Sequence, residues 1–458
     1  MSDVDEHGTG RRATGLAWAV VLLVCAALAG NAAREKHGGD GDAALRSPVS
    51  QIDLKLLVAE RSLGRTWATE PDVSRRLAQP DAGPGTARLP AAAVAAELLG
   101  AAAGRARLDA YEQSGARTPD DDAAAALLRT LWATDAADEI AARADALTDA
   151  ERQTLATRLS WAGRLAARPA GTRDGAGRAQ VLGEARRLGA TLLIVAAIAA
   201  ALFVTSLVLL GGAAIGAATG RFRARFDVRR CEGVPLLPTF AAWLTVLGAT
   251  VLASRALPWI GVIGMPLSLL ALVWPARRVG WTRLRVALGW TRGRGLLREI
   301  MWGVAAYVAG LPIVFAGFIA SALLAMLARR LGLPADASHP IVHGLPGADT
   351  AAFAGTLFLA AVAAPFLEET FFRGALYGHL RGATRTWSRS ASVLVSAVTS
   401  ALLFAAVHPQ SWIGVPVIAS LGVAFALARE WRGSLIAPMV AHALTNAGTL
   451  SLARTLLS

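Results

Sequence analysis

The 458-residue chain is 54% hydrophobic and carries a formal net charge of +13. This is more apolar surface than soluble cores need, and several apolar windows are long enough to cross a bilayer. The positive charge lies largely in arginines of short loops beside those windows, which the positive-inside rule explains and nucleic-acid binding does not. With only Cys25 and Cys231, the chain has neither a disulfide framework nor a cysteine-based metal site.

The first apolar window covers about Gly15 to Ala33, so residues 1–33 contain an N-terminal tail and either a membrane helix or a signal sequence. Both alternatives place the N-terminus in the cytoplasm and send the next segment outward. Residues 34–187 are rich in Ala, Arg and Asp with helical periodicity, and Thr148 to Glu151 has the form of a capping box. We therefore expect an inserted extracytoplasmic all-helical domain, to which no motif assigns a function.

Basic loops then alternate with apolar windows through the rest of the chain. The loops at 221–230, 277–298, 381–389 and 429–432 are basic and are expected on the cytoplasmic face. The windows run over 188–218, 238–253, 259–274, 300–327, 351–380, 391–408, 412–428 and 434–457. These divide into membrane helices at 188–330 and a second membrane region at 351–458. The predicted fold class is all-α, a polytopic bundle of eight or nine transmembrane helices in a bacterial-type inner membrane.

The window that begins at Ala351 contains an unusual group of charges. Glu368 and Glu369 are adjacent, and Arg373 follows one helical turn after Glu369. Ionisable groups at membrane depth cost roughly 2.5–3.5 kcal/mol on insertion scales, so they usually face a protein interior and serve a function. The i,i+4 spacing permits a Glu369–Arg373 ion pair that could simply neutralise itself, while Glu368 projects about 100° away.

Two later windows contribute further polar groups. Of seven histidines, only His408 and His442 are assigned to apolar windows, and Asn446 shares a helix face with His442. A single intramembrane histidine is most often a hydrogen-bond partner between helices. Three neighbouring windows that all carry such groups instead indicate a common site.

Together these residues form three motifs in a fixed order: Glu-Glu-x-x-x-Arg at Glu368, Glu369 and Arg373, Phe-x-x-x-His at Phe404 and His408, and His-x-x-x-Asn at His442 and Asn446. This pattern resembles the CPBP family of intramembrane proteases, which includes type II CAAX prenyl endopeptidases and bacterial Abi-type immunity proteins. The resemblance covers about residue 351 to the C-terminus and leaves residues 34–187 unexplained.

The resemblance implies an endopeptidase that acts on a protein or peptide substrate in or near the bilayer. It implies that Glu368 is the general base for water with help from His408, and that His442 and Asn446 stabilise the oxyanion. The remaining motif residues would support them: Glu369, Arg373 and Phe404. No cofactor is expected.

Three alternatives stay open at this stage. Glu368, His408 and His442 are candidate zinc ligands for a metal-dependent version of the same protease, although no His-Glu-x-x-His helix is present. A non-catalytic scaffold or immunity-type protein would use the same bundle to hold a partner. A transporter with a proton relay is the third, but we detect no internal repeat. Counting residues from the window ends also places Glu368 and His408 at different depths.

Overall fold

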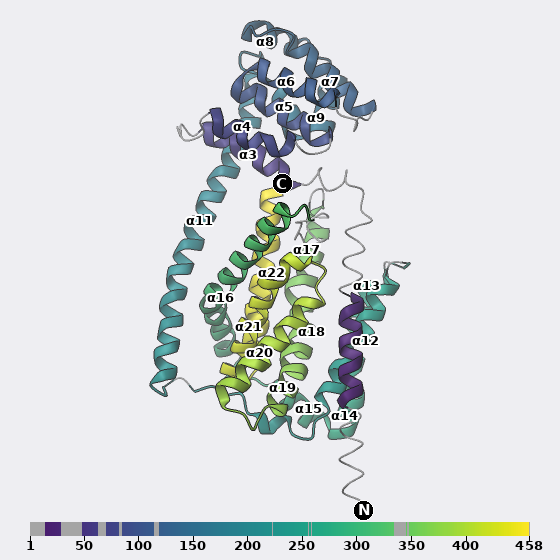
Figure 1. Cartoon of the computed structure of the whole chain (residues 1–458), viewed down its shortest axis with the longest axis vertical. Helices are drawn as coiled ribbons and strands as arrows, with labels where there is room; N and C mark the ends of the chain where they lie inside the picture. The colour runs from purple at the N-terminus through teal and green to yellow at the C-terminus, as the bar shows by residue number, and fades with distance from the viewer. Residues whose placement is uncertain are drawn as a thin grey trace, which may run out of the picture. The chain divides into compact units, whose positions relative to one another are not determined.

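The computed structural model describes residues 14–28, 48–62, 70–81, 85–113, 119–221, 223–254, 256–257, 259–333, 345 and 348–457. Within these ranges the chain is helical with no strand (Figure 1). It divides into two compact units, one of residues 1–37 and 200–453 and the other of residues 38–199 and 454–458. We describe each unit by itself.

The unit of residues 38–199 is built from short helices around an alanine-rich core. Its helices are α3 (Pro48–Ser62), α4 (Glu70–Asp81), α5 (Gly85–Leu99), α6 (Ala101–Glu112), α7 (Pro119–Leu131), α8 (Ala137–Asp145), α9 (Asp149–Leu159), α10 (Trp161–Ala166) and the start of α11 (Gly175–Ala218). Residues 91–95 of α5 are fully or almost fully buried, since small side chains let neighbouring helices approach. The predicted capping box is confirmed: the Thr148 side chain accepts from the Glu151 amide, and the Glu151 carboxylate accepts from the Thr148 amide.

The other unit contains the apolar helices. They are the helix Thr14–Leu28, the rest of α11, η1 (Val228–Cys231), α12 (Leu236–Ala253), α13 (Trp259–Leu267), η2 (Ser268–Leu272), α14 (Val273–Val279), α15 (Trp281–Leu288), α16 (Leu296–Arg330), α17 (Thr350–Phe358), η4 (Leu359–Ala363), α18 (Ala364–Glu368), η5 (Glu369–Leu376), α19 (Tyr377–Ala383), α20 (Arg389–Ala406), η6 (Trp412–Gly414), α21 (Val415–Arg432) and α22 (Ile436–Leu457). The predicted polytopic all-α bundle is confirmed.

Six helices of the described chain are long and apolar enough to span a membrane: Gly175–Ala218, Leu236–Ala253, Leu296–Arg330, Thr350–Ala383, Arg389–Ala406 and Trp412–Arg432. Three of the nine expected windows fall outside this set. The first is the 15-residue helix Thr14–Leu28, and the window at 259–274 is divided among α13, η2 and α14, with Pro266 inside α13. The last is α22, whose hydropathy is lowered by His442, Thr445 and Asn446.

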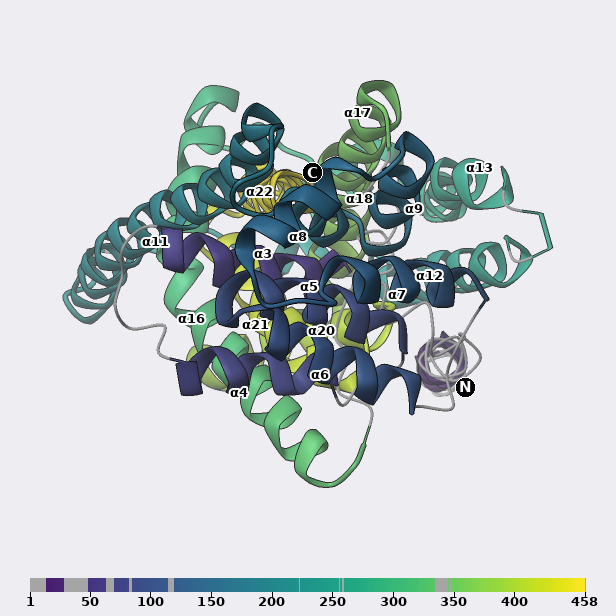
Figure 2. The same cartoon turned by 90° about the horizontal axis from the view of Figure 1, so that it is seen from above.

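Helix α22 lies between α16 and the helix that carries Glu368 (Figures 1 and 2). On the α16 side the approach is close at Gly303, where an added Cβ would come within 2.6 Å of the Val440 Cβ and 2.9 Å of the Ala437 oxygen. Helix Thr14–Leu28 packs beside α12, where Val24 contacts Gly248.

We expect Gly303→Ala to destabilise the bundle by about 1–3 kcal/mol, because the new methyl group would overlap backbone and side-chain atoms of α22. Thermal unfolding of the full chain in detergent measures this. The matched control is Gly211→Ala on α11, where an added Cβ meets nothing within 4 Å. Equal stability of the two variants would contradict the close α16–α22 contact.

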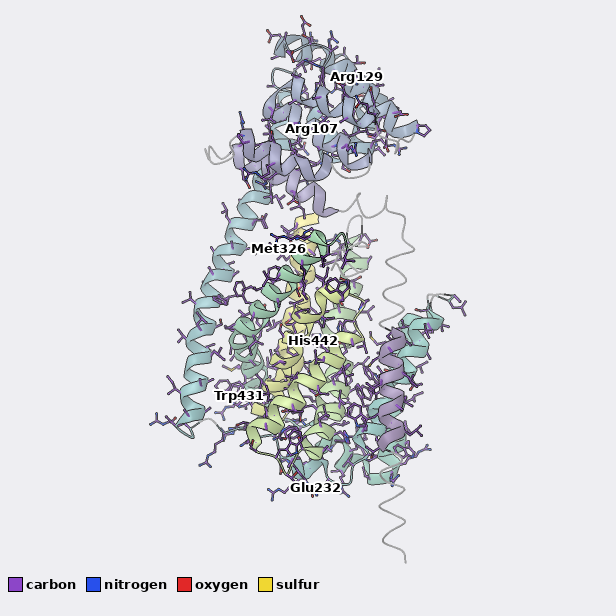
Figure 3. All side chains as sticks on the ribbon, in the orientation of Figure 1. Arg107, Arg129, Glu232, Met326, Trp431 and His442 are labelled. Atoms are coloured by element: carbon purple, nitrogen blue, oxygen red, sulfur yellow. The ribbon has the colours of Figure 1, made fainter. Side chains whose placement is uncertain are left out.

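The four basic segments meet at one end of this unit. The amides of Arg225 and Phe226 donate to the Glu430 carbonyl oxygen, and Arg283 donates to the carbonyl oxygen of Glu232. Figure 3 shows Trp431 and Glu232 near this end, away from His442. These contacts agree with the prediction that the basic loops share one face.

Candidate active site

A nearly continuous helix from Thr350 to Ala383 positions the two glutamates, and it changes its winding on both sides of Glu368. The segments η4 and η5 are π-helical, with the Ala364 amide bonded to the Leu359 oxygen and the Tyr377 amide bonded to the Phe372 oxygen. Single π-turns of this kind are frequent at functional sites. Between them, the five-residue α18 has Pro365 in its first turn and ends at Glu368.

Glu368 faces two histidines from other helices. Its Oε2 lies 3.8 Å from His442 Nε2 and 4.0 Å from His408 Nε2. Within the described chain this buried oxygen has no hydrogen-bond partner, although 23% of the Glu368 side chain is exposed. An oxygen atom placed about 2.8 Å from Glu368 Oε2 and from either imidazole nitrogen fits these separations.

Hydrogen bonds at Nδ1 fix both imidazoles. His408 Nδ1 lies 2.7 Å from the Phe404 oxygen, and His442 Nδ1 lies 2.9 Å from Glu369 Oε1. A carbonyl oxygen and a carboxylate accept hydrogen bonds, so Nδ1 is the protonated nitrogen in both rings. This orientation directs each Nε2 toward Glu368.

Glu369 also makes the predicted ion pair with Arg373, whose Nη1 lies 2.9 Å from Glu369 Oε1 with both side chains fully buried. The second guanidinium nitrogen, Nη2, donates to the Gly422 oxygen at 3.1 Å. The Arg373 guanidinium lies 4.4 Å from the centre of the Phe404 ring and 5.2 Å from that of Phe425. Aromatic faces and one carbonyl therefore complete the environment of a charge that water does not reach.

Asn446 lies one turn after His442, as predicted, but its side chain forms a hydrogen bond with the helix backbone of η4. Its Nδ2 donates to the Ala360 oxygen at 2.7 Å. The structure thus brings Glu368, His408 and His442 together, while Asn446 connects α22 to the first π-helical segment. An amide nitrogen carries two hydrogens, so this bond leaves one for another acceptor.

Two features of the site were not predicted. Phe425 stacks on the His442 ring, with centroids 4.8 Å apart and planes at 21°, and Gly422 supplies both a carbonyl and the space beside Arg373. In the sequence they look like ordinary apolar residues of α21. His379, which the sequence analysis did not assign to an apolar window, lies in α19, with its ring centroid 6.0 Å from that of Trp18.

The expected difference in depth between Glu368 and His408 is also resolved. His408 follows the end of α20, and Glu368 lies within the helix that precedes it. Glu368 Oε2 and His408 Nε2 lie 4.0 Å apart, so the two side chains reach the same level.

Glu368, His408 and His442 are the candidate zinc ligands. In the part of the chain that the structure describes, no group of three or more His, Cys, Asp or Glu side chains is arranged to hold a metal ion.

Comparison with known families gives this arrangement a context. The family described as "Type II CAAX prenyl endopeptidase Rce1-like" matches residues 350–448, the segment that contains all three motifs. This C-terminal domain belongs to the CPBP family. The CPBP domain is also similar to the membrane-embedded CAAX protease MroQ of Staphylococcus aureus (strain USA300), with 32% identity over 90 residues. That match covers 20% of this chain and 36% of MroQ. No solved structure gave a significant match.

Proposed function

We propose that the protein is an intramembrane endopeptidase in which Glu368 activates the attacking water. The observation that carries the proposal is the position of Glu368 Oε2, which faces the Nε2 atoms of His442 and His408 at 3.8 and 4.0 Å inside a CPBP domain. Peptide hydrolysis needs a group that takes a proton from water and donors for the oxyanion. The residues around Glu368 provide both.

The proposed reaction begins with transfer of a water proton to Glu368 while His408 Nε2 accepts the second hydrogen bond of that water. The hydroxide oxygen then forms a bond with the carbonyl carbon of the peptide, while the carbonyl π bond breaks and its electron pair moves to the oxygen. That electron pair re-forms the carbonyl as the carbon–nitrogen bond breaks, and Glu368 returns the proton to the leaving nitrogen.

His442 and Asn446 are the proposed donors to the oxyanion. His442 would donate from Nε2, while its Nδ1 bond to the Glu369 carboxylate holds the ring in place. The free amide hydrogen of Asn446 is the second donor. Glu369, Arg373 and Phe404 act as positioning residues, because they hold the imidazole of His442 rather than the substrate.

The metal-dependent alternative makes a different prediction for the purified protein. If zinc were required, active preparations would contain it in stoichiometric amount and a chelator would abolish cleavage. We expect activity to be independent of zinc content, which elemental analysis of active and chelator-treated protein measures. Loss of cleavage that returns on adding zinc would contradict the proposal.

The substrate can be sought without assuming its chemistry. Quantitative profiling of new protein termini in membranes that contain the wild type or Glu368→Gln should reveal peptides that depend on Glu368. Glu232→Gln, which changes a half-exposed carboxylate at the other end of the unit, is the matched control. A scaffold would instead give identical profiles, and Glu368→Ala would retain its phenotype.

A further inference from the structure

The basic end of the membrane unit contains an open cavity of about 440 Å³. It lies where the loop before η1 meets the turn between α19 and α20. Its walls are residues 224–229 together with Arg381, Arg385, Trp387 and Arg389. Five of these residues are arginines and only Asp227 is acidic.

The carboxylates near the cavity do not balance its arginines. Arg381 and Arg389 share the single carboxylate of Glu430, with Nη2 of each 3.3 Å from Glu430 Oε1. Two more carboxylates pair with cavity arginines: Asp227 with Arg229 and Glu232 with Arg385. These two pairs are largely exposed to solvent, so the attraction between their charges is weak.

Arg225 adds a further positive charge on the wall. Its side chain has no ion pair among the residues that the structure describes. Loss of hydration lowers the pKa of Arg225, and the positive charges of Arg294 and Arg432 lower it further. The potential at this wall is therefore positive and favours an anion.

One side of the cavity is rigid and the other is accessible. The Arg381 side chain is 8% exposed and is fixed by Glu430, Ser392 and the face of Phe226. By contrast, the side chains of Arg229 and Arg385 are 82% and 58% exposed. A fixed wall with accessible guanidinium groups at its rim suits phosphate oxygens, which arginine binds through paired N–H donors.

We propose that this arginine cavity binds a phosphate-bearing anion, with an anionic phospholipid headgroup as its carrier. The cavity lies at the ends of two membrane spans, Thr350–Ala383 and Arg389–Ala406. Trp387, half-exposed on its wall, has the amphipathic ring typical of the membrane interface. Basic pockets at the ends of membrane spans bind acidic lipid headgroups. A site for a soluble phosphate compound would not need to lie at the ends of membrane spans.

Native mass spectrometry of the full chain in detergent tests the proposal with phosphatidylglycerol, phosphatidylcholine of the same acyl chains, and inorganic phosphate as a competitor. We expect tighter binding of phosphatidylglycerol than of phosphatidylcholine. The double variant Arg229→Gln/Arg385→Gln should bind phosphatidylglycerol more weakly, by roughly five-fold for each arginine removed. Arg277→Gln/Arg278→Gln removes the same charge from exposed residues that do not line the cavity and should bind as the wild type does.

The outcomes separate the sources of the anion. Competition by millimolar phosphate without preference between the lipids would assign the cavity to a soluble phosphate compound and reject the lipid headgroup. An equal loss of affinity for phosphatidylglycerol in both double variants would show that binding depends only on surface charge, and would contradict the proposed site. Thermal unfolding of the lipid-free variants should match that of the wild type, since all four arginines are exposed.

Discussion

Glu368→Gln is expected to lower the rate of peptide cleavage by about 10²–10⁴-fold while the protein remains folded. The amide has the shape of the carboxylate but does not accept a proton from water. Glu368 Oε2 has no hydrogen-bond partner in the described chain and faces His442 Nε2 and His408 Nε2 at 3.8 and 4.0 Å, so the substitution breaks no hydrogen bond of this oxygen. The loss should appear in kcat.

A cleavage assay and a thermal unfolding curve on the same preparation measure the two effects. Glu232→Gln should match the wild type in both, because Glu232 is half-exposed and remote from His442. If Glu368→Gln cleaves at the wild-type rate while Glu369→Gln is inactive and fully stable, the roles that we propose for the two glutamates are reversed.

Glu369→Gln is expected to reduce stability and activity together. The fully buried Arg373 would lose its carboxylate partner, and breaking a buried pair on one side typically costs about 3–5 kcal/mol. The same oxygen, Glu369 Oε1, contacts His442 Nδ1, so the imidazole would also lose the group that orients it. Thermal unfolding in detergent and cleavage at several pH values measure the two losses.

A second buried pair offers a matched control. Arg432 Nη2 lies 2.6 Å from Glu299 Oε1, with side chains that are 3% and 0% exposed, but neither residue contacts the histidines. Glu299→Gln should destabilise the protein to a similar extent while the folded fraction keeps its activity. The double variant Glu369→Gln/Arg373→Met should recover stability without recovering cleavage, because it removes the unpaired charge but leaves His442 unsupported. A double variant as active as the wild type would show that Glu369 serves only to neutralise Arg373.

Much of the site could be predicted because its residues are conspicuous in an apolar sequence. Glu368, His408 and His442 are polar groups in membrane windows, and the Glu369–Arg373 pair follows from their spacing along one helix. The contact between Glu369 and His442 joins two helices 73 positions apart, and helical periodicity contains no information on such a pairing. Phe425 and Gly422 were missed for a similar reason, since apolar residues that support a site resemble those that face lipid.

The depth prediction failed because of where the residue count began. Counting inward from Ala351 assumes that the apolar window starts at the membrane surface. Arg381 is the better reference, because it is buried and paired with Glu430 at the basic end of the unit. The winding of this helix also changes at η4 and η5, which counting with a uniform rise ignores.

The two π-helical segments change the direction in which side chains point along the helix that carries Glu368. Each π-turn accommodates one more residue than an α-turn, which shifts the angular position of everything beyond it by about 100°. Side chains before η5 and side chains after it therefore point in directions that differ from those in a uniform α-helix, although they belong to one continuous helix. After η5, Tyr377 and Arg381 donate hydrogen bonds to Glu430. Before η5, Glu368 faces the two histidines. The helix is therefore held at its basic end by Glu430, while the winding of η5 sets the direction in which Glu368 points.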